Sequence, residues 1–204
     1  MRFGTYIVFL SAFMFGTFLS RAAIILAAKY GIMDQPNPIV PQHTAPTARL
    51  GGAAIAAASL CSLVLYKLLV PAAVLAQSDR LESLPPLVSG ATLFLLVGLV
   101  DDLTELAPAS KFALQALAAV GAGFMGLVYP WTGVRLIDFV SSCFWILVLV
   151  NAVNLIDVCD GLVGGLALIV SIFFACFGPG NHLLPGALAG ACAGFLIFNP
   201  GFPI

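Results

Sequence analysis

The sequence predicts an all-α membrane protein, a polytopic bundle of about seven transmembrane helices. Of its 204 residues, 61% are hydrophobic and only 8% carry a charge. A soluble domain carries about 25% charged residues, so this chain has too few to cover a surface that faces water. Its apolar residues also fall in long runs, and a run of about 20 such residues is long enough to cross a bilayer.

Seven stretches fit this description, and prolines or glycines mark several of the breaks between them. They cover approximately residues 5–28, 52–76, 84–100, 112–129, 136–153, 162–178 and 183–199. The first is longer than the roughly 7–15 apolar residues of a cleaved signal peptide, because it continues past Arg21 through Ala22–Ala28. We therefore expect a first membrane span there, and residues 1–204 as a single integral membrane domain.

The remaining composition excludes several classes of function. The net charge is -1, which leaves no basic surface for nucleic acid. The cysteines have neither zinc-ligand nor redox spacing, and most lie in apolar stretches where a free thiol acts as a small hydrophobic group. They are Cys61, Cys143, Cys159, Cys176 and Cys192.

Most of the carboxylates are expected on one face of the membrane. Consecutive spans alternate in direction, because an unpaired backbone cannot end inside lipid. The loops at 29–51, 101–111 and 154–161 therefore share a face with the C-terminal end. This face holds Asp34, Asp101, Asp102, Glu105, Asp157 and Asp160. Lys and Arg occur on both faces, so their count does not orient the protein.

The first acidic cluster follows Gly98 at the end of a span, where Asp101 and Asp102 are adjacent and Glu105 comes three residues later. Two neighbouring carboxylates at a membrane boundary need a cation, a proton or a ligand. Because they point to different sides of a helix, one can hold a metal while the other takes a proton. A solvated helix end with ordinary charges explains the pair equally well.

The second cluster repeats a polar residue at every third position. Asn151, Asn154, Asp157 and Asp160 are separated by apolar residues, and glycines follow from Gly161. On a continuous helix, Asn154, Asp157 and Asp160 would share one face. A polar stripe on such a helix is energetically expensive, which favours a functional site. The alternative is a stripe of hydrogen bonds between helices.

The first loop carries a third group of polar residues. Its prolines favour an extended backbone, and it places His43 and Arg49 on the acidic face. An arginine there suits phosphate binding. A solvated loop whose cations reach lipid headgroups explains the same residues.

Together the two acidic clusters offer hard oxygen ligands on one face. This set suits Mg²⁺, which binds a few carboxylates and completes its octahedron with water and substrate phosphate. Zinc would require Cys or His ligands. The sequence therefore suggests phosphate chemistry that joins a water-soluble donor to a lipid acceptor.

The motifs resemble those of the polyprenyl-phosphate N-acetylhexosamine-1-phosphate transferases, which form glycosyltransferase family 4. The resemblance covers about residue 30 to the C-terminus and rests on three motifs in the family's order. They are Asp34-x-Pro36-Asn37 with His43, Pro46 and Arg49-x-Gly51-Gly52; Gly98-x-x-Asp101-Asp102 with Lys111 and Gln115; and Asn151-x-x-Asn154-x-x-Asp157-x-x-Asp160-Gly161.

The resemblance implies transfer of a sugar 1-phosphate from a UDP-N-acetylhexosamine to undecaprenyl phosphate, with release of UMP. It also implies a requirement for Mg²⁺, which Mn²⁺ could replace. The implied location is the bacterial inner membrane, where membrane lipids surround the chain and the acidic face is cytoplasmic. The resemblance is also compatible with a homodimer. The implied catalytic residues are Asp101, Asp102, Asp157 and Asp160, of which Asp157 and Asp160 bind the metal; the implied substrate-binding residues are His43, Arg49, Lys111, Asn151 and Asn154.

Two departures from the family pattern bear on activity. The first loop resembles the branch that uses UDP-GlcNAc-type donors, but no basic residue lies between Asn37 and His43. The sequence also ends at Ile204, before the family's next motif, which supplies a further aspartate to the metal site. We expect this chain to be the N-terminal part of a longer fold, with little or no activity if it is the whole product.

Two other classes of function fit parts of the sequence. A transporter or ion pathway also uses Asp and Asn within membrane spans, but such sites lie near the middle of the bilayer. A catalytically inactive membrane fragment would bind Mg²⁺ or nucleotide weakly and turn nothing over.

Overall fold

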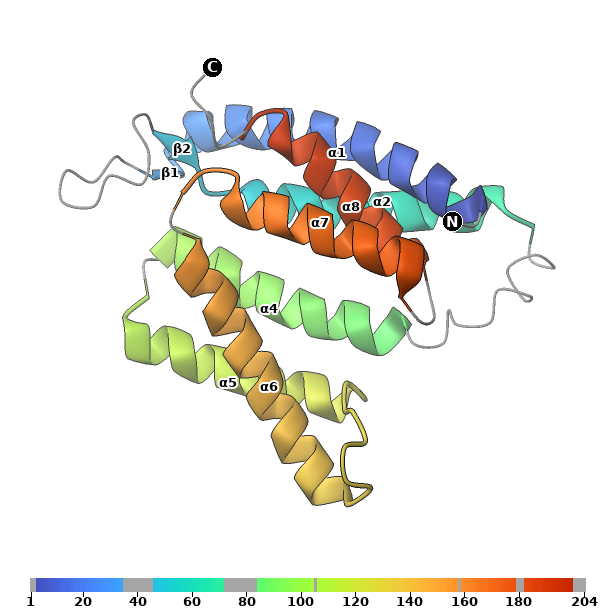
Figure 1. The fold of residues 1–204 in the computed structure, drawn as a ribbon. Coiled ribbons are helices and arrows are strands. Elements are labelled where there is room, and N and C mark those ends of the chain that lie inside the picture. The colour runs from blue at the N-terminus through green and yellow to red at the C-terminus, as the bar shows by residue number, and fades with distance from the viewer. Residues whose placement is uncertain are drawn as a thin grey trace. The chain divides into compact units, whose positions relative to one another are not determined.

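The computed structural model describes residues 3–34, 46–71, 84–104, 106–157, 159–178 and 182–199. Within these ranges the chain forms seven helices and one two-stranded sheet (Figure 1). The elements are α1 (Phe3–Tyr30), β1 (Met33–Asp34), β2 (Thr47–Ala48), α2 (Gly51–Leu69), α4 (Leu84–Thr104), α5 (Pro108–Phe124), α6 (Arg135–Ile156), α7 (Leu162–Phe177) and α8 (Leu183–Leu196). Each predicted apolar stretch corresponds to one of these helices, so the all-α membrane fold is confirmed.

The helices differ in whether they can cross a bilayer alone. Four described helices, α1, α2, α4 and α6, are long and apolar enough to do so. Helices α7 and α8 are apolar but have 16 and 14 residues, and α5 has 17. At about 1.5 Å per residue these three are shorter than a hydrocarbon core of about 30 Å. The protein is thus a multi-pass membrane protein, and its described residues contain four full-length candidate spans.

Several helix ends differ from the sequence prediction; α5, for example, covers Pro108–Phe124 in place of about 112–129. Two of the other differences have a local explanation. Helix α2 ends at Leu69 instead of continuing to about residue 76, because Val70 precedes Pro71 and takes the extended conformation that a following proline favours. Helix α4 continues past the predicted end at residue 100 to Thr104, since neither Gly nor Pro interrupts it there. Asp101 and Asp102 therefore lie in its last helical turn and not in a loop.

The chain divides into two compact units, which we describe separately. The first comprises Met1–Leu81 with Asp157–Ile204, and the second comprises Glu82–Ile156. In the first unit, α8 packs against α1, α2 and α7, and α1 also packs against α2 (Figure 1). The single membrane domain expected from the sequence stays a prediction.

Close packing of α8 on α1 depends on glycine. Gly186, Gly190 and Gly194 recur at every fourth position and are buried. A Cβ atom at Gly190 would collide with the carbonyl oxygen of Phe9, and one at Gly194 would lie 2.5 Å from the carbonyl oxygen of Phe13. Such a stripe of small residues lets two backbones approach closely inside a membrane, where van der Waals contact replaces the hydrophobic effect between helices.

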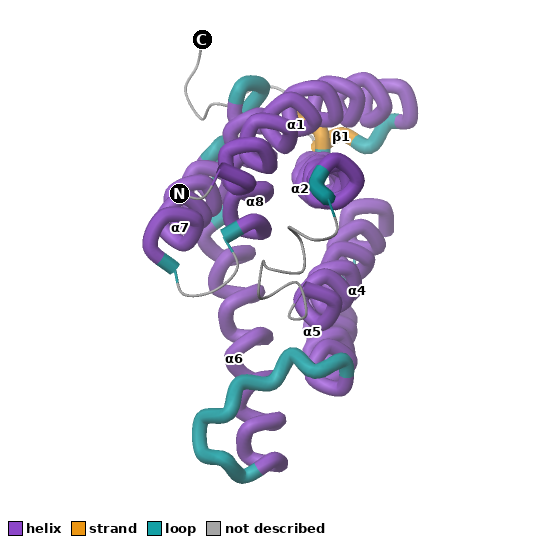
Figure 2. The backbone as a smooth tube through the Cα atoms, turned by 90° about the vertical axis from the view of Figure 1, so that its right-hand side faces the viewer, coloured by secondary structure: helices purple, strands orange, loops and turns teal. Residues whose placement is uncertain are grey.

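The second unit has α5 as its middle helix. It packs against both α4 and α6, and the loop of residues 125–134 joins it to α6 (Figure 2). Asp138, in the first turn of α6, is buried and fixes this loop by accepting hydrogen bonds from the backbone N–H of Thr132 at 2.7 Å and of Gly133 at 3.1 Å. Asp138 therefore has a structural role at the end of the unit opposite to Asp101.

The glycine stripe gives a direct test of the packing in the first unit. Gly190→Ala should lower the free energy of unfolding by about 1–3 kcal/mol, because the new methyl group forces the backbones of α1 and α8 apart. Gly165→Ala in α7 is the matched control: no described atom lies within 4 Å of its Cβ position, and alanine is the better helix former. Helix melting followed by far-UV circular dichroism in detergent measures both. Equal melting temperatures for the two variants would contradict the close α1–α8 contact.

Candidate active site

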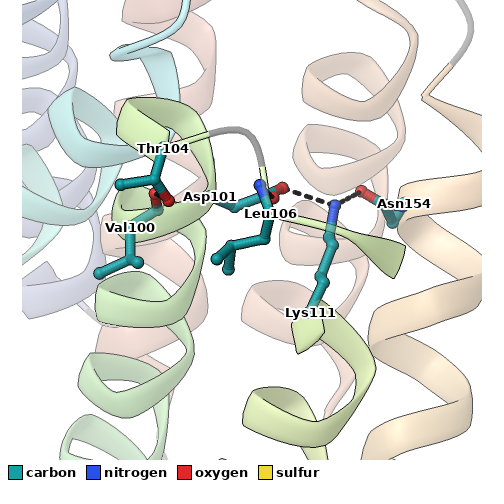
Figure 3. Close-up of polar contacts among 6 residues, drawn as sticks. All are labelled: Val100, Asp101, Thr104, Leu106, Lys111 and Asn154. Atoms are coloured by element: carbon teal, nitrogen blue, oxygen red, sulfur yellow. Dashed lines mark hydrogen bonds and ion pairs between the residues drawn. The ribbon is translucent and has the colours of Figure 1, made fainter. Parts of the chain in front are cut away.

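A charged side chain connects three helix ends in the second unit. The Lys111 ammonium nitrogen lies 2.8 Å from Oδ2 of Asp101 and donates a hydrogen bond to Oδ1 of Asn154 at 3.2 Å (Figure 3). Asp101 belongs to the last turn of α4, Lys111 to the first turn of α5 and Asn154 to the last turn of α6. We call these three residues the Lys111 cluster.

The connection between α4 and α5 places the cluster. Ala107 is extended and precedes Pro108, which starts α5 because a proline suits the first helical position. Oδ1 of Asp101 accepts a hydrogen bond from the backbone N–H of Leu106 at 3.3 Å, which ties this connection to the end of α4. The chain reverses within a few residues, so the start of α5 lies beside the end of α4.

Electrostatics explains why Lys111 needs acidic and amide partners. The N-terminus of a helix carries a partial positive charge, so a lysine in the first turn of α5 is unfavourable by itself. The Asp101 carboxylate supplies the compensating charge. Both side chains are partly withdrawn from water, with exposed fractions of 26% for Lys111 and 21% for Asp101. A pair this accessible contributes about 1 kcal/mol to stability, so its main effect is to fix positions.

Two further predicted residues, Asp102 and Asn151, lie close along the chain to members of the cluster. Asp102 follows Asp101 and is rotated by about 100° around α4, so the two carboxylates leave the helix in different directions. Asn151 lies one turn before Asn154 and donates a hydrogen bond to the carbonyl oxygen of Leu147 in its own helix at 2.9 Å. Their predicted roles stay predictions.

The polar stripe expected on one helix is instead divided between two elements. Helix α6 ends at Ile156, so Asp157 is no longer helical and Asp160 lies in a turn before α7. Gly161 closes this turn with φ at 74°, a left-handed conformation that glycine adopts without strain. The prediction that Asn154, Asp157 and Asp160 share one helical face is therefore wrong.

Asp157 and Asp160 nevertheless form an acidic pair in the first unit. The Asp157 side chain is exposed, but neighbouring protein atoms remove part of its hydration, and this desolvation raises its pKa. The Asp160 carboxylate raises the pKa further through charge repulsion. A cation bound to both carboxylates would relieve this repulsion.

The acidic pair suits a hard cation by the chemistry of its donors. Two carboxylates are the number that Mg²⁺ commonly takes from a protein, and waters and substrate phosphate complete its octahedron. Among the residues that the structure describes, no group of three or more His, Cys, Asp or Glu side chains is arranged to hold a metal ion. A metal bound by Asp157 and Asp160 would thus need further ligands other than the described His, Cys, Asp and Glu side chains.

The first loop contributes an ion pair across its short sheet. Strands β1 and β2 are antiparallel, with Asp34 opposite Thr47. Nη2 of Arg49 donates a hydrogen bond to Oδ1 of Asp34 at 2.7 Å, which orients the guanidinium at the start of α2. His43 lies outside the described residues, as does Glu105. Phosphate binding by Arg49 stays a prediction.

A small cavity lies beside this hairpin. Its volume is about 260 Å³, and its wall includes Ser20 of α1, Thr47 of β2, Gly51 of α2 and Phe195 and Asn199 near the end of α8. Ser20 is buried, and its hydroxyl has no hydrogen-bond partner among the described residues. The hairpin, the start of α2 and the end of α8 therefore meet at one end of the first unit, as the alternation of spans predicts.

The residues that shape the α4–α5 connection were not singled out from the sequence. The hydroxyl of Thr104 donates a hydrogen bond to the carbonyl oxygen of Val100 at 2.7 Å (Figure 3), and the backbone of Leu106 binds Asp101. The signal for this connection was Pro108 shortly after the acidic pair, which indicates a helix start.

These features define a class: a multi-pass membrane protein whose ionic and amide side chains meet at helix ends. The chain belongs to glycosyl transferase family 4, because the model of that family matches residues 84–202. This range contains α4 through α8 and the whole Lys111 cluster.

Curated relatives agree with this assignment. The decaprenyl-phosphate N-acetylglucosaminephosphotransferase of Mycolicibacterium smegmatis is 33% identical over 200 residues, covering 86% of this chain and 48% of the relative. The enzyme of that name from Mycobacterium tuberculosis H37Rv is 32% identical over 95% of this chain and 53% of its own length. A phospho-N-acetylmuramoyl-pentapeptide-transferase of Clostridioides difficile is 34% identical over 52% of this chain and 41% of the relative.

The chain spans about half the length of the N-acetylglucosaminephosphotransferases it matches, at 48% and 53% of the relatives. No solved structure matches it. The relatives divide between two kinds of named sugar-phosphate substrate, an N-acetylglucosamine phosphate and a phospho-N-acetylmuramoyl-pentapeptide. Family membership therefore leaves the donor sugar undecided.

The Lys111 cluster makes a specific prediction about energetic coupling. Lys111→Met and Asp101→Asn should be coupled by about 1 kcal/mol in a double-mutant cycle, because each substitution removes the same ion pair. The control cycle combines Lys111→Met with Asp138→Asn, because the Asp138 carboxylate binds the loop of residues 125–134 at the opposite end of the unit. Denaturant unfolding in detergent, followed by the combined fluorescence of Trp131 and Trp145, measures the four free energies of each cycle. Coupling of equal size in both cycles would contradict the assignment of Asp101 as the partner of Lys111.

Proposed function

We propose that this chain carries part or all of the active site of a polyprenyl-phosphate N-acetylhexosamine-1-phosphate transferase. The donor is a UDP-N-acetylhexosamine, the acceptor is undecaprenyl phosphate and the released nucleotide is UMP. The observation that supports this proposal most strongly is the Lys111 cluster, in which family-motif residues from three helices meet at helix ends. The names of the relatives support the class of reaction.

The proposed chemistry is a single phosphoryl transfer. A phosphate oxygen of the lipid attacks the β-phosphorus of the UDP-sugar and forms a new P–O bond. The bond from the β-phosphorus to the oxygen that bridges it to the α-phosphorus breaks, and UMP leaves with the electron pair. Because the reacting groups are already anionic, catalysis consists mainly of positioning and of stabilising negative charge.

Lys111 and Asp101 take different parts in this proposal. The Lys111 ammonium lies at a helix N-terminus, so it and the helix dipole both offer positive charge to a phosphate. Both carboxylate oxygens of Asp101 already have donors, Lys111 on one and the Leu106 backbone on the other. This arrangement favours a positioning role for Asp101. By the resemblance of its motif, Asp102 is proposed to accept or orient the acceptor's proton.

The acidic pair of the first unit is the proposed metal site. Asp157 and Asp160 would hold Mg²⁺ or, in its place, Mn²⁺. When bound, the metal would neutralise the charge of the donor diphosphate. Asn154 would orient the donor, and Asn151, Arg49 and His43 would contribute further substrate contacts.

A transporter accounts less well for the same residues. Transport sites lie near the middle of the bilayer, on interrupted helices. In this chain, Asp101, Lys111 and Asn154 all belong to the terminal turns of their helices. This location suits chemistry at the membrane surface. We assign that surface to the cytoplasmic face of the bacterial inner membrane, where the chain would serve cell-envelope synthesis.

The proposal predicts UMP release that requires lipid, metal and the aspartate pair. The chain is assayed in detergent with undecaprenyl phosphate, UDP-GlcNAc and Mg²⁺, alone and co-expressed with the C-terminal half of the Mycolicibacterium smegmatis relative. Asp102→Asn should lower the rate by about 100-fold or more, as expected when a group that acts in the transition state is removed. Lys67→Met, at an exposed lysine in the last turn of α2, should leave it unchanged. No release in either form, with UDP-GlcNAc or with UDP-MurNAc-pentapeptide as the donor, would overturn the proposed function.

The metal site has its own test. Asp157→Asn should abolish UMP release while the helix content measured by circular dichroism stays the same, since the side chain is exposed. Removal of divalent cations with a chelator should stop the wild-type reaction, and added Mg²⁺ should restore it. A wild-type rate for Asp157→Asn would show that this residue does not hold the catalytic metal.

A further inference from the structure

Arg21 is among the cations of the first unit that the proposed reaction does not use. Arg21 is exposed on α1 and, among the described residues, makes no hydrogen bond or ion pair. The buried residues of α1 include Ala12, Gly16 and Ser20, so Arg21 points away from the face that packs inside the unit. Helix α1 contains no Asp or Glu that would compensate its charge.

The position of Arg21 along α1 matches a membrane boundary. Helix α1 has 28 residues, so it is about 42 Å long and exceeds a hydrocarbon core of about 30 Å. Arg21 lies 18 residues after Phe3, which corresponds to about 27 Å. A hydrocarbon core that began at Phe3 would end about 3 Å beyond the backbone of Arg21. From there the long arginine side chain can reach the lipid phosphates.

An apolar groove runs along α1 beside Arg21. Its volume is about 630 Å³, and Phe13, Met14, Phe18 and Ile25 line it together with Phe198, which follows α8. The lining residues of α1 recur at helical spacing and form one stripe. Thr17, also in the wall, already donates its hydroxyl to the carbonyl oxygen of Phe13 at 2.8 Å. The groove thus offers hydrocarbon contacts below a single positive charge.

The charge of Arg21 restricts what can occupy this groove. An arginine at the edge of the hydrocarbon core is energetically expensive without an anion, and the described part of the chain supplies none. A phospholipid phosphate is abundant at this depth and accepts a bidentate hydrogen bond from a guanidinium. Its acyl chain would run from Arg21 toward Phe3, along Phe18 and Phe13.

We propose that the groove of Arg21 on α1 binds an anionic phospholipid, with the phosphate on Arg21 and one acyl chain along Phe13, Met14 and Phe18. This site is separate from the Lys111 cluster and does not depend on the proposed enzymatic function. It would hold a structural lipid on the side of α1 that points away from α2 and α8.

Native mass spectrometry of the full chain in neutral detergent tests the proposal. The probes are phosphatidylglycerol and phosphatidylcholine with identical acyl chains. Wild type should retain phosphatidylglycerol in preference, by roughly fivefold for one arginine at an anionic headgroup. Arg21→Gln should lose this preference, and Arg21→Lys should keep most of it. Lys67→Gln is the matched control, because it removes an exposed cation from the same unit without touching the groove.

Three outcomes would overturn the proposal. The first is equal retention of the two lipids by wild type. The second is an unchanged preference in Arg21→Gln, provided that circular dichroism shows the same helix content. The third is displacement of phosphatidylglycerol from wild type by equimolar undecaprenyl phosphate, which would make the occupant the polyprenyl lipid. None of these outcomes depends on UMP release, so the lipid-binding proposal and the proposed enzymatic function are tested independently.

Discussion

Hydrocarbon cannot form hydrogen bonds with a peptide backbone, and the arrangement of this protein follows from that constraint. Each apolar stretch must satisfy its own backbone as a helix, and charged side chains are tolerated mainly where helices end. The chemistry of the chain is therefore concentrated at helix termini. Within the second unit, alternation of three helices brings the end of α4, the start of α5 and the end of α6 together, and Lys111 joins them.

The two units are stabilised in different ways. In the first, small residues let backbones touch, and Gly190 on α8 lies directly against the carbonyl oxygen of Phe9 on α1. In the second, polar contacts fix both ends: the Lys111 cluster at one and Asp138 with its loop at the other. The glycines of α8 let this helix pack tightly on α1. The charged groups remain available where water and phosphate can reach them.

Hydropathy and alternation were sufficient to predict the seven helices and the grouping of polar residues at one end of each unit. Helix ends were less predictable, because no residue near position 100 signals the continuation of α4 through Asp101. The error at Asp157 has a similar origin: a period of three suggests one helical face, but Gly161 permits a left-handed turn that ends the pattern. The contact of Lys111 with both Asp101 and Asn154 could not be derived, since it depends on how three separate helices pack.

We propose that the positive charge of Lys111, held between helix ends, serves phosphate transfer. The most direct measurement compares UMP release by Lys111→Arg and Lys111→Met in the same membranes, with undecaprenyl phosphate and a UDP-N-acetylhexosamine. The methionine variant should lose about 100-fold or more of the rate, while the arginine variant, which keeps the charge, should retain a larger share. A methionine variant as fast as wild type would contradict it.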